Sequence, residues 1–166
     1  MTIRVLTGGL QTTVQDLGRP SHQHQGIPGG GAMDRMAMRI ANLVVGNDAS
    51  AAALETTLIG PSLLFTEETL IALTGADLEA AVGTTAIPLW HAALLPAGTT
   101  LHFGRALRGC RTYIAVAGGI DVHLVVLIAP GAVPVVVLEG EAVRIHARVA
   151  GCAGGISTVL FHPDSH

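Results

Sequence analysis

The sequence has few charged residues: Asp, Glu, Lys and Arg make up only 13% of its 166 residues, about half the share of an average soluble protein. The nine basic residues are scattered along the chain, and the formal net charge is -3. No basic patch is available to bind a phosphate backbone, so nucleic acid is excluded as a ligand. With so little charge, much of the surface must be apolar or covered by another chain, which predicts a partner protein.

Long hydrophobic runs are also lacking. The longest, Leu124 to Ile128 and Val133 to Leu138, fall far short of the ~20 residues that a helix needs to cross a bilayer. The N-terminal residues MTIRVLTGG contain neither the extended apolar segment nor the cleavage site of a secretory signal. We therefore expect a cytoplasmic protein with no membrane-spanning segment.

Only two cysteines occur, Cys110 and Cys152, and they do not form a CxxC motif. One disulfide between them is possible in principle, but in a cytoplasmic chain we expect both to be reduced and buried. His22 and His24 have the HxH spacing of a metal site, but no third ligand has a compatible spacing. No metal is expected, and the common nucleotide-binding, serine-hydrolase and metalloprotease motifs are missing.

Gly, Pro, Asn and Asp separate short apolar or alternating runs along most of the chain, which is typical of a mainly β barrel or sandwich. Turns are predicted between these runs, at Gly60-Pro61, Gly75 to Asp77, Pro96 to Gly98 and Gly118-Gly119. The predicted strands are Ile3 to Leu6, Leu54 to Ile59, Leu63 to Phe65, Thr69 to Leu73, Ala86 to Trp90, Thr99 to Phe103 and Cys110 to Ala117.

One segment has helical periodicity instead. Apolar residues repeat there at spacings of three and four: Met33, Met36, Ala37, Ile40, Ala41 and Val44. Asp34 lies near the positive end of this predicted helix, and Gly46 with Asn47 can end it in the left-handed conformation. The residues Asp48 to Leu54 predict a second short helical turn, with Asp48 or Ser50 as its cap. The fold expected is a curved sheet with one or two short helices.

A dense polar and glycine-rich stretch precedes the helix. Gly29 to Gly31 lead into the helix, where backbone N–H groups could stabilise a carboxylate, a phosphate or a developing oxyanion; the alternative is a flexible connection. Arg19 could pair with Asp16 in a turn or face a carboxylate ligand. Asp77 and Asp121 lie at predicted turns, where Asp commonly accepts hydrogen bonds from nearby backbone N–H groups.

Five stretches in order carry a family resemblance: VLTGGLQTTVQDLGRP (5–20), GGAMDRMAMRIANLVVGN (30–47), AALETTLIGPSLLF (52–65), ALTGADLEA (72–80) and RGCRTYIAVAGGIDV (108–122). Together they resemble the N-terminal part of the family of the 5-oxoprolinase C subunit, also called allophanate hydrolase subunit 2 or KipA-like. The carboxyltransferase domain of urea carboxylase is a relative. The resemblance implies a cyclophilin-like β-barrel, two of which make up a full-length member, and residues 1–122 would form the first.

The resemblance also implies site residues at positions that match the family motifs. As catalytic residues we expect Asp16, Arg19 and Asp34, where the glycine loop and Arg19 would stabilise an oxyanion and Asp16 or Asp34 would handle a proton. The expected substrate-binding residues are Gln15, Gly30, Met33, Asn42, Asn47, Glu55, Thr74 and Asp77.

The function implied is that of one component of an ATP-dependent 5-oxoprolinase, which opens 5-oxoproline to glutamate, or of a related amide carboxyltransferase complex. This chain would be a hydrolase component that is inactive alone and works with the A and B subunits on a small amide substrate. ATP, and any biotin, would be bound by those partners, since no MKM-like biotinylation motif occurs here. The alternatives are a regulatory protein that sequesters an inhibitor of a sensor histidine kinase, and an inactive truncated remnant.

The resemblance stops after Val122. Residues 123–166 lack the serine- and arginine-containing turn and the second barrel expected of a full-length member. One interpretation is a frameshifted or truncated reading frame, which translation of the DNA in its other frames would test. The other is a set of final strands, because Val133 to Leu138 and Ala142 to Val149 both have strand-like composition.

Overall fold

The computed structural model describes residues 2–18, 30–120, 136–138, 144–146 and 159–161. Within these residues it has one helix, α1 (Arg35–Val44), and is otherwise built of strands. The strands are β1 (Thr2–Thr7), β2 (Thr12–Gln15), β3 (Ala53–Thr57), β4 (Ser62–Phe65), β5 (Thr69–Asp77), β6 (Ala81–Val82), β7 (Thr85–Ala86), β8 (Ala92–Leu95), β9 (Thr99–His102), β10 (Arg108–Val116), β11 (Val136–Leu138), β12 (Arg144–His146) and β13 (Val159–Phe161). The mainly β fold class is confirmed.

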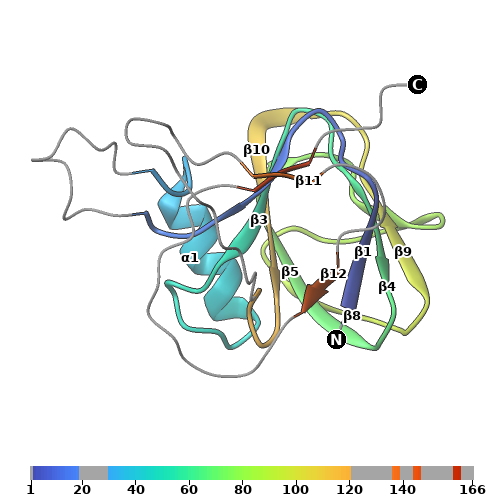
Figure 1. The fold of residues 1–166 in the computed structure, drawn as a ribbon. Coiled ribbons are helices and arrows are strands. Elements are labelled where there is room, and N and C mark those ends of the chain that lie inside the picture. Colours follow the sequence, from blue (N-terminus) through green and yellow to red (C-terminus); the bar gives the residue numbers. More distant parts are fainter. Residues whose placement is uncertain (1, 19–29, 121–135, 139–143, 147–158, 162–166) are drawn as a thin grey trace, which may run out of the picture.

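The strands form two sheets. One has the order β12-β1-β4-β9-β6-β7 and the other β11-β13-β2-β3-β10-β5-β8. All neighbouring pairs are antiparallel except β11 with β13. Figure 1 shows α1 lying outside the sheets, beside β3, while β1, β4 and β9 lie on the opposite side. The strands β3, β5 and β10 therefore have the first sheet on one side and α1 on the other.

Side chains of β10 alternate between two apolar clusters because successive residues of a strand point to opposite faces. Ile114 and Val116 belong to the cluster between the sheets, whereas Tyr113 and Ala115 pack on the helix side. All four are buried. The helix-side cluster is rich in alanine, which lets α1 approach the sheet closely: its sheet residues include Ala53, Ala72 and Ala115. Burial of both faces explains why the second half of β10 is an almost continuous apolar run.

The helix begins and ends as its sequence indicates, but its buried face differs from the predicted one. Asp34 is the N-cap, and Gly46 follows the helix with a positive φ of 78°. The buried residues of α1 are Ala37, Met38, Ala41 and Asn42. Met33 and Met36, which the periodicity places on the apolar face, are 70% and 64% exposed. Met36 lies on the same outer face of α1 as exposed Leu43, and Met33 precedes the helix.

Three local predictions were wrong. The residues Asp48 to Leu54 form a turn, closed by the Ser50 N–H donating to Asp48 Oδ1 at 2.7 Å, and then enter β3 without a second helix. The predicted strand Ala86 to Trp90 is a loop after β7, because Pro88 cannot donate to a ladder and Trp90 has a φ of 65°. The predicted turn at Gly75 to Asp77 is the end of β5.

Strand β2 was not among the predicted strands, although its residues belong to one of the family-like stretches. Six predicted strands match observed ones: β1, β3, β4, β5, β9 and β10. In residues 123–166, β11 and β12 lie within the two segments predicted as strands, and β13 pairs with β2. The domain boundary at 122 and the reading-frame hypothesis stay predictions.

Among the described residues, no helix is long and apolar enough to span a membrane.

Candidate functional site

A cavity of about 670 Å³ lies where the start of α1, the end of β5 and the start of β10 meet. This volume is within the range of small-molecule sites in proteins. Charged and apolar side chains are mixed in its lining, which consists of Met33, Asp34, Gly75, Ala76, Asp77, Leu89, Trp90, Arg108, Gly109, Cys110 and Arg111. It is a candidate binding site formed by described residues.

The carboxylate of Asp34 caps the helix at the edge of this cavity. Its Oδ1 accepts hydrogen bonds from the backbone N–H groups of Met36, at 3.1 Å, and Ala37, at 2.9 Å. The Ala32 N–H donates to the carbonyl of Asp16 at 2.8 Å. These donors are therefore already used inside the protein. They are not available to a ligand, which removes much of the support for an oxyanion site at the helix start.

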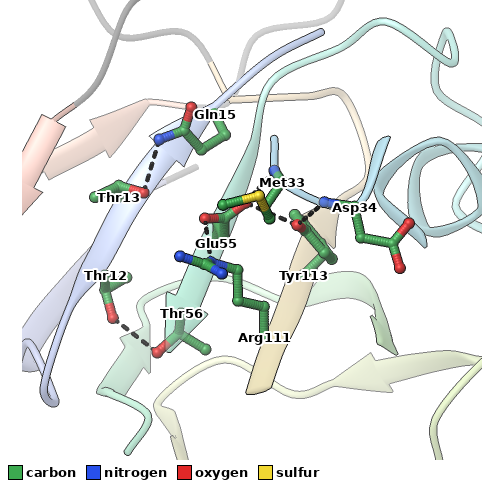
Figure 2. Close-up of polar contacts among 9 residues, drawn as sticks. All are labelled: Thr12, Thr13, Gln15, Met33, Asp34, Glu55, Thr56, Arg111 and Tyr113. Atoms are coloured by element: carbon green, nitrogen blue, oxygen red, sulfur yellow. Dashed lines mark hydrogen bonds and ion pairs between the residues drawn. The ribbon is translucent and has the colours of Figure 1, made fainter. Parts of the chain in front are cut away.

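A buried carboxylate, Glu55 of β3, links the helix start to β10 (Figure 2). Its Oε2 accepts the Met33 N–H at 2.9 Å and the Tyr113 hydroxyl at 2.7 Å. Its Oε1 accepts Arg111 Nε–H at 3.0 Å, which also forms an ion pair. Only 7% of Glu55 is exposed, whereas the Arg111 side chain is 28% exposed. Glu55 thus fixes the position of Arg111, which lines the cavity, although Glu55 itself does not line it.

The Tyr113 hydroxyl completes this network. It accepts a hydrogen bond from the Asp34 N–H at 2.7 Å while it donates to Glu55. Burial raises the pKa of Tyr113 well above its ordinary value of 10.0; the hydrogen bond to Glu55 and the charges of Glu55 and Asp34 add to the rise, while the Asp34 N–H opposes it. Tyr113 therefore stays a neutral donor at any physiological pH.

The alkaline titration of Tyr113 is directly measurable, because this is the one tyrosine in a sequence that contains no lysine. The folded protein keeps a proton that the unfolded chain loses, so stability is unaffected by this group below about pH 10 and falls as pH rises above it. We expect tyrosinate absorbance near 295 nm to be missing from the native protein at pH 11 and to appear on adding urea. Tyrosinate absorbance in the folded protein at that pH would contradict the buried network.

The structure brings only part of the predicted site together. Met33, Asp34 and Asp77 line the cavity, and Glu55 lies behind it. Asp77 Oδ1 accepts the Glu79 N–H at 3.0 Å, as expected of an Asp at the end of a strand. Gly30 is exposed, and its carbonyl accepts from Arg35 Nη2 at 3.4 Å.

Asn42, Asn47 and Thr74 do not line the cavity. Asn42 Nδ2 donates to the Ala51 carbonyl at 2.7 Å, and its Oδ1 accepts from Asn47 at 3.0 Å. Asn47 also donates to the Val116 carbonyl at 2.8 Å and so ties the end of α1 to the end of β10. Thr74 donates to a helix carbonyl, that of Ala37, at 2.7 Å. These side chains hold α1 on the sheet, which is a structural role.

The remaining predicted residues lie near the end of β2 or outside the described residues. Gln15 donates to Thr13 at 3.0 Å, apart from the cluster around Glu55 (Figure 2). Asp16 Oδ1 accepts the Gly18 N–H at 2.7 Å, so it shapes the turn that follows β2. Arg19 lies outside the described residues, as do His22 and His24, and the Asp16–Arg19 pair stays a prediction. No cluster of potential metal ligands occurs among the described residues.

Sequence reasoning missed several residues that the structure places at the site. Arg108, Cys110, Arg111 and Tyr113 all come from the family-like motif RGCRTYIAV, from which no site residue was predicted. Two arginines three residues apart at the start of a strand were the available signal. Cys110 is exposed, so the expectation that it is buried was wrong. Cys152 lies outside the described residues.

The part of the chain that forms the cavity matches the model of a known protein family. Residues 25–127 match the model of the carboxyltransferase domain, subdomain A and B, and this range contains the whole cavity lining. The match covers more than half of the chain. The chain therefore belongs to the carboxyltransferase subdomain A and B family, as its sequence motifs indicated.

Individual relatives agree with this assignment. The chain is 47% identical to the C subunit of Escherichia coli 5-oxoprolinase over 122 residues, which are 72% of this chain and 39% of that protein. It is 40% identical to urea amidolyase of Saccharomyces cerevisiae over 72% of this chain and 7% of the relative. The crystal structure of Kluyveromyces lactis urea carboxylase superposes with a TM-score of 0.70 at 40% identity, covering 72% of this chain and 11% of that one. The chain thus spans well under half the length of these relatives.

Proposed function

We propose that this chain is one component of an ATP-dependent complex that opens 5-oxoproline to glutamate or performs a related carboxyl or acyl transfer at an amide nitrogen. The observation that carries the proposal is the cavity in which two carboxylates, Asp34 and Asp77, and two guanidinium groups, Arg108 and Arg111, lie together in the lining. The 47% identity to the C subunit of a 5-oxoprolinase supports this proposal. Because the relatives also include urea amidolyase, the choice of 5-oxoproline as the substrate is itself proposed.

The charges of the cavity suit an amide substrate. A carboxylate can accept an amide N–H and can take or return its proton, while a guanidinium can bind a negatively charged oxygen of the substrate. Asp34 is the better candidate for handling a proton than Asp16, because Asp34 lines the cavity and Asp16 does not. The glycine loop and helix start are weak candidates for the oxyanion role, since the N–H groups of Ala32, Met33, Asp34, Met36 and Ala37 have partners within the protein. The arginines of β10 are cavity donors that can instead hold a negatively charged group of the substrate.

Partner proteins follow from the same proposal. We propose that the A and B subunits supply ATP binding and the rest of the active site, and that this cytoplasmic chain is inactive alone. Covalent biotin has no place on these 166 residues, because biotin is joined to a lysine side chain and the sequence contains no lysine. The 13% charged composition, with exposed Leu6, Leu10 and Leu107, is consistent with a surface that another protein covers.

The direct test combines this chain with the A and B subunits and measures ATP-dependent release of glutamate from 5-oxoproline. Turnover that requires all three chains supports the proposal. Stable association with the B subunit but no turnover with 5-oxoproline would instead favour the regulatory protein or the inactive remnant. Carboxylation of urea under the same conditions would point to the second class of relatives.

Asp34→Asn separates the two candidates for the proton-handling group. Asparagine is as good an N-cap as aspartate, so the substitution keeps the helix cap and removes the base. We expect kcat to fall about 100-fold or more, with little change in the free energy of unfolding. Asp16→Asn is the matched control, for which we expect kcat within about twofold of the wild-type value. The reverse order of effects would return the role to Asp16.

A further inference from the structure

The two cavity arginines come from one strand at a spacing that a regular strand would place on opposite faces. Arg108 and Arg111 are three residues apart, an odd number, and side chains alternate along a strand. The register of β10 against β5 shifts between them: Arg108 pairs with Asp77, and Thr112 pairs with Gly75. Four steps along β10 thus oppose two along β5, which defines an irregular, bulged segment. Gly109, with a φ of 82°, lies within it. The bulge turns both guanidinium groups to the same cavity.

The two arginines differ in how firmly they are held. Arg111 is fixed by the ion pair of its Nε with buried Glu55 at 3.0 Å, and no hydrogen bond among the described residues uses its Nη groups. Arg108 is exposed, and the described part of the chain offers it no ion pair. A guanidinium has five N–H donors, so the pair has most of its donors left for a ligand. The anchored Arg111 and the exposed Arg108 can both donate to one carboxylate group.

We propose that Arg108 and Arg111 form a subsite for a carboxylate group, so that the ligand of this cavity is an amide that also carries a carboxylate. The guanidinium fork matches a carboxylate in shape and charge. The cavity carboxylates, Asp34 and Asp77, would repel a second anionic group and would accept the amide N–H instead. The ligand is therefore an acidic amide or lactam, and neutral urea would leave the arginines without a partner. Because it treats this ligand as the substrate of the complex, the inference rests on the proposed function.

The test compares two probes that differ only in the carboxylate: 5-oxoproline and 2-pyrrolidinone. Their binding to the intact chain is measured by NMR titration. We expect the wild-type chain to bind 5-oxoproline at least tenfold more tightly than 2-pyrrolidinone. Arg108→Gln and Arg111→Gln should each weaken 5-oxoproline binding about tenfold or more and leave 2-pyrrolidinone binding unchanged. Arg105→Gln, an equal charge change at an exposed residue outside the cavity lining, is the control and should leave both unchanged.

Several outcomes overturn the subsite: equal affinity of the wild-type chain for both probes, no saturable binding of 5-oxoproline, or the same loss in the Arg105→Gln variant. If Arg111→Gln fails to fold, Arg108→Gln decides alone, because exposed Arg108 has no ion pair within the described chain to lose.

Turnover by the complex separates this inference from the proposed function. If the complex is inactive but binding of 5-oxoproline still depends on the two arginines, only the proposed function is overturned. An active complex whose KM for 5-oxoproline is unchanged by Arg108→Gln overturns only the subsite.

Discussion

Replacing Glu55 by alanine is expected to lower the free energy of unfolding by about 2–4 kcal/mol, because three donors lose their shared acceptor at once. The Met33 N–H, the Tyr113 hydroxyl and Arg111 Nε all bond to its carboxylate, and the tyrosine is fully buried. Partial exposure of Arg111 lets water replace one of the three bonds and keeps the loss below that of a wholly buried pair. Urea denaturation measures the loss.

Glu68→Ala is the matched control, since Glu68 is an exposed acid and the substitution makes the same charge change. Its effect should stay within about 0.5 kcal/mol. The Glu55 variant should also lose much of its affinity for 5-oxoproline, because Arg111 no longer has a fixed position. Equal stability of the two variants would mean that the Glu55 network does not hold the helix start on the sheet.

The sequence predicted the elements that local rules determine. The helix over Arg35–Val44 followed from its periodicity, with Asp34 near its start and Gly46 at its end. Six strands followed from alternation and turn residues. The errors came where tertiary contacts override those rules: Asp77 pairs with Arg108, so β5 continues through residues that resemble a turn. Likewise, Met36 is exposed although it belongs to the helical pattern, because it lies on the same outer face of α1 as exposed Arg39 and Leu43.

The candidate site was harder to predict than the fold. Polar residues in family motifs were all equal candidates in the sequence, but Asn42, Asn47 and Thr74 use their polar atoms to fasten α1 to the sheet. The arginines could not be chosen from sequence, because alternation would separate Arg108 from Arg111. Only the bulge between β10 and β5 brings them to one cavity, and its position depends on pairing between strands that are far apart in the sequence.

Gly75→Ala should cost about 3–5 kcal/mol in the free energy of unfolding, because Gly75 packs against the backbone of the bulged part of β10. Its φ is 91°, and an added Cβ would collide with the carbonyl oxygen of Arg111. The collision is with backbone, so no side chain can rotate to relieve it. Either the two strands separate, which displaces Arg111 from the cavity wall, or the chain fails to fold.

Gly83→Ala isolates the contribution of the collision. Gly83 also has a positive φ, 57°, but an added Cβ would meet nothing within 4 Å. Only backbone strain should be added there, about 1 kcal/mol. Thermal or urea unfolding of the two variants therefore gives the cost of holding β5 against β10 at the cavity. If both glycines tolerate alanine equally well, the close approach at Gly75 does not constrain the pairing of β5 with β10.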